Sequence, residues 1–130
     1  MPREWEQVEL GERFPKPAGA YSPVVRAGDF LFVAGQVPTN PESGEVVGET
    51  VAEQTRFVLE KLAMTLEAAG SSLRAVVSVT AYLADIGTWD EFNRAYRSCF
   101  EAPFPTRTTV GAGLHGVLVE VTATAYSPQK

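Results

Sequence analysis

Two residue types that commonly mark chemical sites are almost absent from this chain of 130 residues. Cys99 is its single cysteine and His115 is its single histidine. A lone cysteine excludes an internal disulfide bond, and a lone histidine argues against a zinc site formed by protein side chains alone. We therefore expect no metal site.

Long apolar runs and an excess of positive charge are also missing. No run approaches the roughly 20 apolar residues that a membrane-spanning helix needs, and the N-terminus lacks the basic-then-apolar pattern of a secretory signal. We expect a cytoplasmic protein that crosses no membrane. The 11 Lys and Arg residues against 16 Asp and Glu residues give a net charge of −5. An acidic surface repels phosphate backbones, so no nucleic acid partner is expected.

The composition that remains is typical of a globular protein. Hydrophobic residues make up 45% of the chain and charged residues 21%, which is enough apolar material for a core. The length fits a single domain over residues 1–130. Residues 1–23 are interrupted by Pro15, Pro17 and Pro23, and we expect them to form a leading arm.

The first half of the chain shows a hairpin pattern followed by a helix pattern. Residues 24–26 and 30–34 are rich in β-branched and aromatic side chains and flank a turn signal. Residues 46–47 are a candidate short strand. Thr50 and Glu53 then form a capping-box pattern, which predicts a helix that begins here and carries one apolar stripe.

The second half alternates between strand and helix patterns. Residues 75–83 have a period of two, which predicts a strand with two distinct faces. One face carries Val77, Val79, Ala81 and Leu83, and the other carries Val76, Ser78, Thr80 and Tyr82. A second capping-box pattern, from Thr88 to Glu91, predicts another helix. Its apolar stripe consists of Trp89, Phe92, Tyr96, Cys99 and Phe100.

Two further strands are predicted over residues 107–111 and 117–126. Two helices cannot cover both faces of a sheet of five or six strands. We therefore predict an α+β fold in which a mixed sheet of that size has both helices packed on one face. The other face would need a partner subunit or would meet water.

Residues 111–116 satisfy the GxGxxG pattern of dinucleotide-binding loops. Such a loop must open a helix, whereas a valine-rich strand follows here, so we interpret it as a glycine-rich hairpin between the last two strands. His115 lies in this loop without a neighbouring acid to orient it, which favours a solvated side chain over a catalytic base. Cys99 lies on the apolar stripe of the second helix, where thiols usually pack as small hydrophobes.

Two charged residues attract attention for their chemistry. Glu120 alternates with valines in a strand that we expect to be central in the sheet. If its face of the sheet is buried, the carboxylate must be paired, protonated or placed in a polar cavity. An exposed sheet face would explain it without any such partner. Arg107 follows the proline-rich segment 103–106, and its planar fork of donors suits a carboxylate. A surface ion pair is the more common explanation for an arginine at the start of a strand. Chemistry alone leaves both roles open.

Taken in order, short segments of the chain resemble the RidA (YjgF/YER057c/UK114) family. No single segment is specific to the family, but six segments in the same order are specific together. The Pro-x-Arg segment and the later Val-Glu pair are the strongest part of the resemblance. The resemblance begins at residues 19–23 (GAYSP). The six segments are 32–38 (FVAGQVP), 54–55 (QT), 66–70 (LEAAG), 92–96 (FNRAY), 105–108 (PTRT) and 119–121 (VEV).

This resemblance implies a chorismate-mutase-like fold assembled as a homotrimer, with sites in the clefts between subunits. It also implies an enzyme that needs no cofactor and deaminates short 2-imino or enamine acids, such as 2-iminobutanoate and 2-iminopropanoate. Water adds to the imine carbon, ammonia leaves and a 2-keto acid remains. The expected ligand is therefore a small 2-imino or 2-keto acid.

The resemblance also assigns roles by position. Arg107 would bind the substrate carboxylate, and Glu120 would hold or deprotonate the attacking water. Tyr21, Gly35 and Asn93 match pocket positions of the family, Gly35 through its backbone amide.

Two positions depart from the family pattern. Thr109 stands where many members have cysteine, whose backbone carbonyl meets the substrate nitrogen, and a threonine keeps that carbonyl. Ala34 stands where serine is common, so a pocket hydroxyl is missing and the substrate range is affected. Three alternatives stay open: a pathway-specific deaminase of an aminoacrylate-like or aminomuconate-like acid, a binder of small acids without turnover, and an endoribonuclease-type translation inhibitor.

Overall fold

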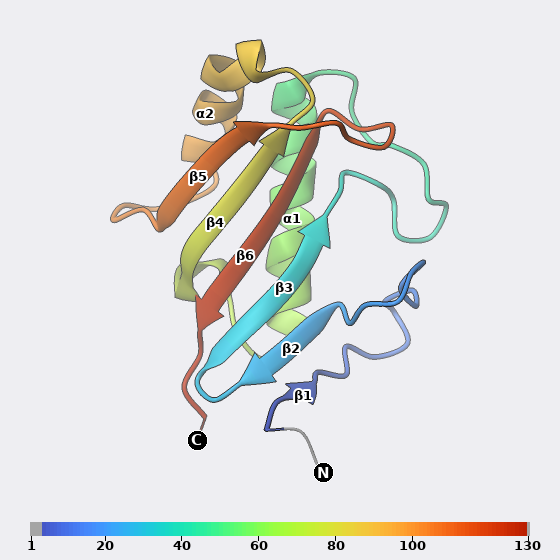
Figure 1. Ribbon diagram of the computed structural model, residues 1–130, viewed down its shortest axis with the longest axis vertical. Helices are drawn as coiled ribbons and strands as arrows, with labels where there is room; N and C mark the ends of the chain where they lie inside the picture. Colours follow the sequence, from blue (N-terminus) through green and yellow to red (C-terminus); the bar gives the residue numbers. More distant parts are fainter. Residues whose placement is uncertain (1–3, 130) are drawn as a thin grey trace.

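The computed structural model describes residues 4–129, which form a single sheet backed by helices (Figure 1). The elements are β1 (Glu6–Gln7), β2 (Val24–Ala27), β3 (Phe30–Gln36), α1 (Val51–Ala68), the 3₁₀ turn η1 (Leu73–Ala75), β4 (Val76–Leu83), the 3₁₀ turn η2 (Ile86–Thr88), α2 (Trp89–Arg97), β5 (Thr106–Gly111) and β6 (Val119–Tyr126).

The strands of the sheet follow the order β1-β2-β3-β6-β4-β5. All neighbouring pairs are antiparallel except β4 and β5, which run parallel. Both α-helices lie behind the sheet in Figure 1. The predicted mixed sheet with two helices on one face is therefore confirmed, and β6, the last strand of the chain, lies between β3 and β4.

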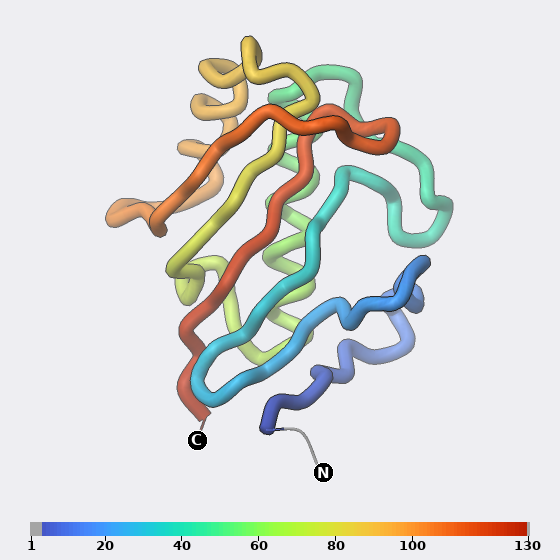
Figure 2. Tube along the Cα trace, viewed as in Figure 1, coloured from blue at the N-terminus to red at the C-terminus, as the bar shows by residue number. Residues whose placement is uncertain are grey.

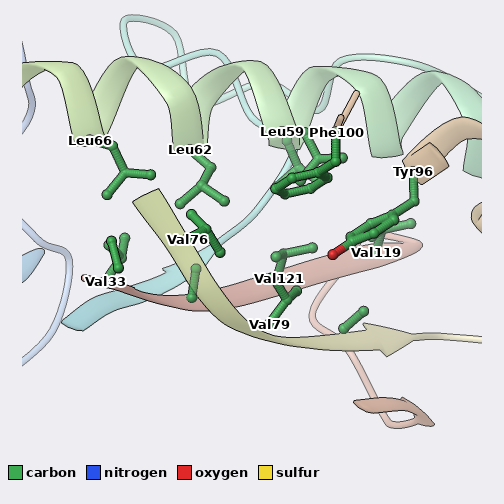
Figure 3. Close-up of a cluster of buried hydrophobic side chains, with 14 of the residues drawn as sticks. Val33, Leu59, Leu62, Leu66, Val76, Val79, Tyr96, Phe100, Val119 and Val121 are labelled. Carbon is green, nitrogen blue, oxygen red and sulfur yellow. The ribbon is translucent and has the colours of Figure 1, made fainter. Parts of the chain in front are cut away.

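The hydrophobic core lies between α1 and the sheet. Figure 3 shows Leu59, Leu62 and Leu66 of α1 pointing towards strand residues such as Val79 and Val121. These leucines are at most 1% exposed, and each fully buried side chain of this size contributes about 1.5–3 kcal/mol. The apolar stripe predicted for this helix is thus the face that holds it on the sheet.

The predicted start of α1 is confirmed by its capping contacts. The Thr50 hydroxyl accepts a hydrogen bond from the Glu53 amide, and the Glu53 carboxylate accepts one from the Thr50 amide, both over 3.1 Å. These bonds satisfy backbone donors that the first helical turn leaves unpaired.

The alternation predicted for β4 is wrong at its first residues. Val77 was predicted to share a face with Val79, but Val77 is 41% exposed, whereas Val76 is buried like Val79. The pairing with β6 shifts between Val76 and Ser78, so one extra residue enters the strand and the following side chains change face.

The sequence predicted that the glycine-rich loop of residues 111–116 is a hairpin turn, and this prediction is wrong. β5 pairs with one edge of β4 and β6 pairs with the other, so β4 separates the two strands. Figure 2 shows the trace between β5 and β6 passing the end of β4. Residues 46–47 also form no strand, since Val46 makes only an isolated bridge with Thr39.

The second predicted capping box is absent as well. The Thr88 hydroxyl donates to the Asp85 carbonyl, and the Glu91 carboxylate accepts from the Ala52 amide over 2.9 Å. Glu91 therefore links the first turns of the two helices instead of capping its own. α2 ends at Arg97, so Cys99 lies beyond the helix and not on its stripe.

The second face of the sheet carries no helix within residues 4–129 (Figure 1). Phe30, Phe32 and Tyr126 project from it and are 40%, 47% and 48% exposed. Monomeric proteins rarely expose a patch of this kind, which is typical of a surface that a partner covers. In the part of the chain described, no helix combines the length and apolar character needed to cross a bilayer.

Candidate active site

Arg107 lies on the edge strand β5 beneath the rings of α2. It pairs with Val79 of β4, which faces the helices, so its side chain projects to the same side of the sheet. The guanidinium carbon lies 4.6 Å from the centroid of Tyr96, 5.2 Å from that of Phe92 and 5.3 Å from that of Trp89. Three aromatic rings thus hold the cation in place through cation–π contacts.

Arg107 has no counter-charge among the described residues, where its guanidinium contacts these three rings. Burial lowers the pKa of Arg107, Tyr96 opposes that change, and the positive charge of Arg97 adds to it. The side chain nevertheless stays charged, because an arginine pKa lies far above neutrality. It opens into a cavity of about 260 Å³ lined by Asn93, Tyr96, Arg97, Phe104, Pro105 and Arg107.

A partly desolvated guanidinium with free donors is a binding site for a carboxylate. Its planar fork can bind both oxygens of one carboxylate at once, which also fixes the orientation of the bound acid. Asn93, half-buried on α2, lines the same cavity and adds a neutral donor and acceptor.

Glu120 lies in the middle of β6 on the opposite side of the sheet. Its neighbours Val119 and Val121 are buried against the helices, so the half-buried glutamate projects to the face without helices. Its carboxylate lies against the backbone of Gly35 in β3.

Gly35 is the residue that makes this approach fit. A Cβ atom at this position would overlap Glu120 Oε2 and would lie 3.1 Å from its Cδ. The pairing of β3 with β6 is irregular between Val33 and Gln36, which places Gly35 within a bulge. A glycine there lets the carboxylate rest directly on the main chain.

Tyr21 and Gly35 line a second, larger cavity. This cavity of about 550 Å³ lies between the leading arm, the end of β3 and α1, and Ala34 also borders it. The Tyr21 side chain is 55% exposed, so much of its ring is free to contact a ligand or a partner.

The site residues predicted from the sequence therefore fall into two groups within one chain. The first group, on the helix side near β5, contains Arg107, Asn93 and Thr109, which pairs with the buried Ala81. The second group, around the end of β3, contains Glu120, Gly35 and Tyr21. Arg107 and Asn93 share one cavity, whose lining does not include Thr109. Gly35 contacts Glu120 and shares the second cavity with Tyr21, and the two groups do not meet within one chain.

The register of the sheet explains the separation. Arg107 is aligned with Val79 of β4 and, through it, with Ala123 of β6, three residues beyond Glu120. β5 and β6 are two strand spacings apart, or roughly 10 Å, and the two side chains also point to opposite faces. One small molecule cannot contact both side chains of the same chain.

The aromatic neighbours of Arg107 were predicted only as packing residues. Trp89, Phe92 and Tyr96 are spaced for one face of α2, and the sequence predicted this stripe without predicting that it also faces an arginine. Trp89 is 39% exposed and Tyr96 is 3% exposed, so the stripe runs from the surface into the core.

The buried hydroxyl of Tyr96 has no hydrogen-bond partner among residues 4–129. Burial raises the pKa of Tyr96 to about 12, although the nearby Arg107 works against the increase. The phenol is therefore neutral at physiological pH and cannot serve as a base there.

The remaining candidates lie away from these groups. His115 is exposed in the loop after β5. Cys99 is half-buried and borders a separate cavity of about 330 Å³, and burial raises the pKa of its thiol. Over residues 4–129, no three His, Cys, Asp or Glu side chains gather where they could bind a metal ion.

Comparisons with known proteins reveal relatives over most of the chain. Residues 11–127 match the family model described as Endoribonuclease L-PSP. A RutC family protein of Pyrococcus horikoshii is 42% identical over 123 residues, which cover 93% of this chain and 98% of that protein. Reactive Intermediate Deaminase A, chloroplastic, of Arabidopsis thaliana is 35% identical over 104 residues, or 80% of this chain and 56% of that protein.

A similar structure is also known. The crystal structure of RidA from an Antarctic Psychrobacter bacterium superposes with a TM-score of 0.84 at 27% sequence identity. The match covers 93% of this chain and 98% of that one.

Proposed function

The chain belongs to the Endoribonuclease L-PSP family and has the predicted chorismate-mutase-like fold, and we propose that it is a cofactor-independent deaminase of short 2-imino acids. The observation that carries this proposal is the Arg107 guanidinium, which has no counter-charge among residues 4–129 and lies over the Tyr96 ring at the edge of the sheet. The resemblance to RidA proteins and the name of the Arabidopsis relative support the same activity.

Arg107 binds the carboxylate next to the imine carbon. This contact holds the C=N bond in one orientation, and Arg107 accepts no proton from the substrate. Asn93 contacts the acid from α2, and the backbone carbonyl of Thr109 accepts a hydrogen bond from the substrate nitrogen.

Glu120 activates the water molecule. It accepts a proton as the water oxygen bonds to the carbon of the protonated imine (C=NH2+), and the resulting carbinolamine has one hydroxyl and one amino group on that carbon. The amino group takes this proton from Glu120 and leaves as ammonia, and the hydroxyl oxygen gives up its own proton as it forms the carbonyl group. The products are a 2-keto acid and ammonia, with no net oxidation.

The two groups of residues meet only between subunits. Since Arg107 and Glu120 face opposite sides of one sheet, we place Arg107 of one subunit opposite Glu120, Gly35 and Tyr21 of another. A homotrimer, in which every interface forms such a site, accounts for this arrangement and for the uncovered apolar face of the sheet. We also propose a cytoplasmic location.

The deciding experiment follows an imine formed in the assay itself. A dehydratase generates 2-iminobutanoate or 2-iminopropanoate, and loss of the imine is followed with and without this protein. Faster loss, abolished in Arg107→Lys, is the expected result. Absence of acceleration with every short imino acid would favour the small-acid binder, and cleavage of RNA at a rate unaffected by Arg107→Lys would favour the nuclease.

A further inference from the structure

Arg97 is a second cation in the cavity of Arg107. It follows Asn93 by one helical turn on α2, and both line the cavity of about 260 Å³. Its guanidinium carbon lies 5.5 Å from the centroid of the Phe104 ring. Like Arg107, it has no ion pair within residues 4–129.

The charge of this cavity is opposite to that of the whole chain. The net charge is −5, yet the lining of this cavity contains two arginines and no acidic residue. Two neighbouring cations repel each other, and that cost is offset when two negative charges bind between them. Within one chain, a cavity with this lining favours a dianion over a monoanion. In the proposed trimer, Glu120 of another subunit adds one negative charge beside the attacking water, and Arg97 remains the cation for a second carboxylate.

We propose that Arg97 selects substrates with a second carboxylate, so that 2-imino dicarboxylic acids are the preferred substrates. The proposal rests on the deaminase function proposed above, in which Arg107 binds the carboxylate beside the imine carbon. Arg97 binds the distal carboxylate, and the chemical step is unchanged: water adds, ammonia leaves and a 2-keto diacid remains. The volume of the cavity lies below the usual range for drug-sized ligands, about 300–1,000 Å³, which suits an acid of a few carbons.

The test compares two imino acids that differ only at the far end. Amino-acid oxidases with catalase generate 2-iminopentanoate from norvaline and 2-iminoglutarate from glutamate, so that a methyl group is replaced by a carboxylate. Arg97→Gln removes the second cation. Arg94→Gln is the matched control, because Arg94 is an exposed arginine of the same helix that does not line the cavity.

The native protein is expected to hydrolyse the diacid with a kcat/KM about tenfold above that of the monoacid, as one charge-assisted hydrogen-bonded pair typically provides. Arg97→Gln is expected to remove this preference, so that kcat/KM for the diacid falls about tenfold relative to that for the monoacid. Arg94→Gln keeps the preference. Added salt weakens the preference because it screens the distal charge.

Failure of this inference is distinguishable from failure of the proposed function. Equal kcat/KM values for the two acids, or equal losses in both variants, would overturn the role of Arg97 while the deaminase activity stands. If neither imine is hydrolysed, the fluorescence of Trp89, whose ring centroid lies 5.3 Å from Arg107, reports binding of 2-oxoglutarate and 2-oxopentanoate. Tighter binding of the diacid that is lost in Arg97→Gln supports the dicarboxylate site, and equal binding of both acids overturns it.

Discussion

Arg107 and Glu120 project from opposite faces of one sheet, and β4 separates the strands that carry them. Each side chain has its own surroundings: the guanidinium of Arg107 contacts three rings, and the carboxylate of Glu120 lies against the backbone of Gly35. If both act on one small acid, they must come from different subunits.

This separation predicts that two inactive variants restore each other. Arg107→Lys and Glu120→Gln subunits, mixed under conditions that allow exchange, form some interfaces with an intact Arg107 from one chain and an intact Glu120 from the other. Random mixing regenerates about a quarter of the native sites. The measurement is the specific activity of the mixture against each variant alone.

Light scattering gives the control for this experiment. The native protein and both variants are expected to be trimers of the 14.1 kDa chain. A monomer at micromolar concentration, or a mixture no more active than its parts, would contradict a site shared between subunits.

Arg107→Lys is expected to lower kcat/KM about 100-fold although the positive charge remains. An ammonium group lacks the planar fork that binds both carboxylate oxygens, and it stacks less well on the rings of Trp89, Phe92 and Tyr96. Steady-state kinetics measures the loss, and an unchanged melting temperature shows that the fold is intact. Near-native kcat/KM would mean that the guanidinium is only structural.

Gly35→Ala is expected to lower kcat about tenfold without unfolding the protein, since the new methyl group displaces a catalytic carboxylate that can rotate away.

Glu120→Gln should lower kcat more than it changes KM, because an amide binds water but is a poor proton acceptor.

Gly113→Ala is the matched control for the glycine substitution. A Cβ at Gly113 meets no atom within 4 Å, and its backbone is not in the left-handed region. Equal activities of the two alanine variants would show that the contact between Gly35 and Glu120 has no role in the reaction.

Tyr96→Phe is expected to stabilise the protein by up to about 1 kcal/mol, because it removes a buried hydroxyl that lacks a partner in residues 4–129. The pKa of Tyr96 is about 12 in the folded chain against an ordinary value of 10.0. The unfolded chain therefore loses this proton first, so the stability of the native protein falls between pH 10 and 12 relative to the variant. Urea denaturation across this range measures the difference, and a less stable variant at neutral pH would reveal a partner for the hydroxyl.

Iodoacetamide at neutral pH is expected to leave the activity intact. Burial raises the pKa of the Cys99 thiol, so little thiolate is present, and the cavity beside it is not that of Arg107. Thr109→Cys adds a thiol on the Arg107 side of β5 and should make the enzyme sensitive to the reagent. Mass spectrometry locates the label, and inactivation of the native protein in step with labelling of Cys99 would contradict this assignment.

Local patterns in the sequence were sufficient for α1 and most of β6. The capping contacts of Thr50 and Glu53 involve residues three apart, and the alternation around Glu120 reflects the pleat of a single strand. The choice of one helical face for the rings of α2 is likewise set by the spacing of neighbouring residues. Each of these features depends on interactions within a few positions of the chain.

The partners of the site residues were decided only by the tertiary structure. The local sequence of residues 111–116 is compatible with a hairpin, but β5 gains its ladder from β4, a distant strand. The bulge at Val77 arises from pairing with β6, and Gly35 meets Glu120 only because β3 lies beside the last strand. Pairing between distant segments depends on the packing of the whole core, so short-range patterns identified Arg107 and Glu120 but not the sheet faces that keep them apart.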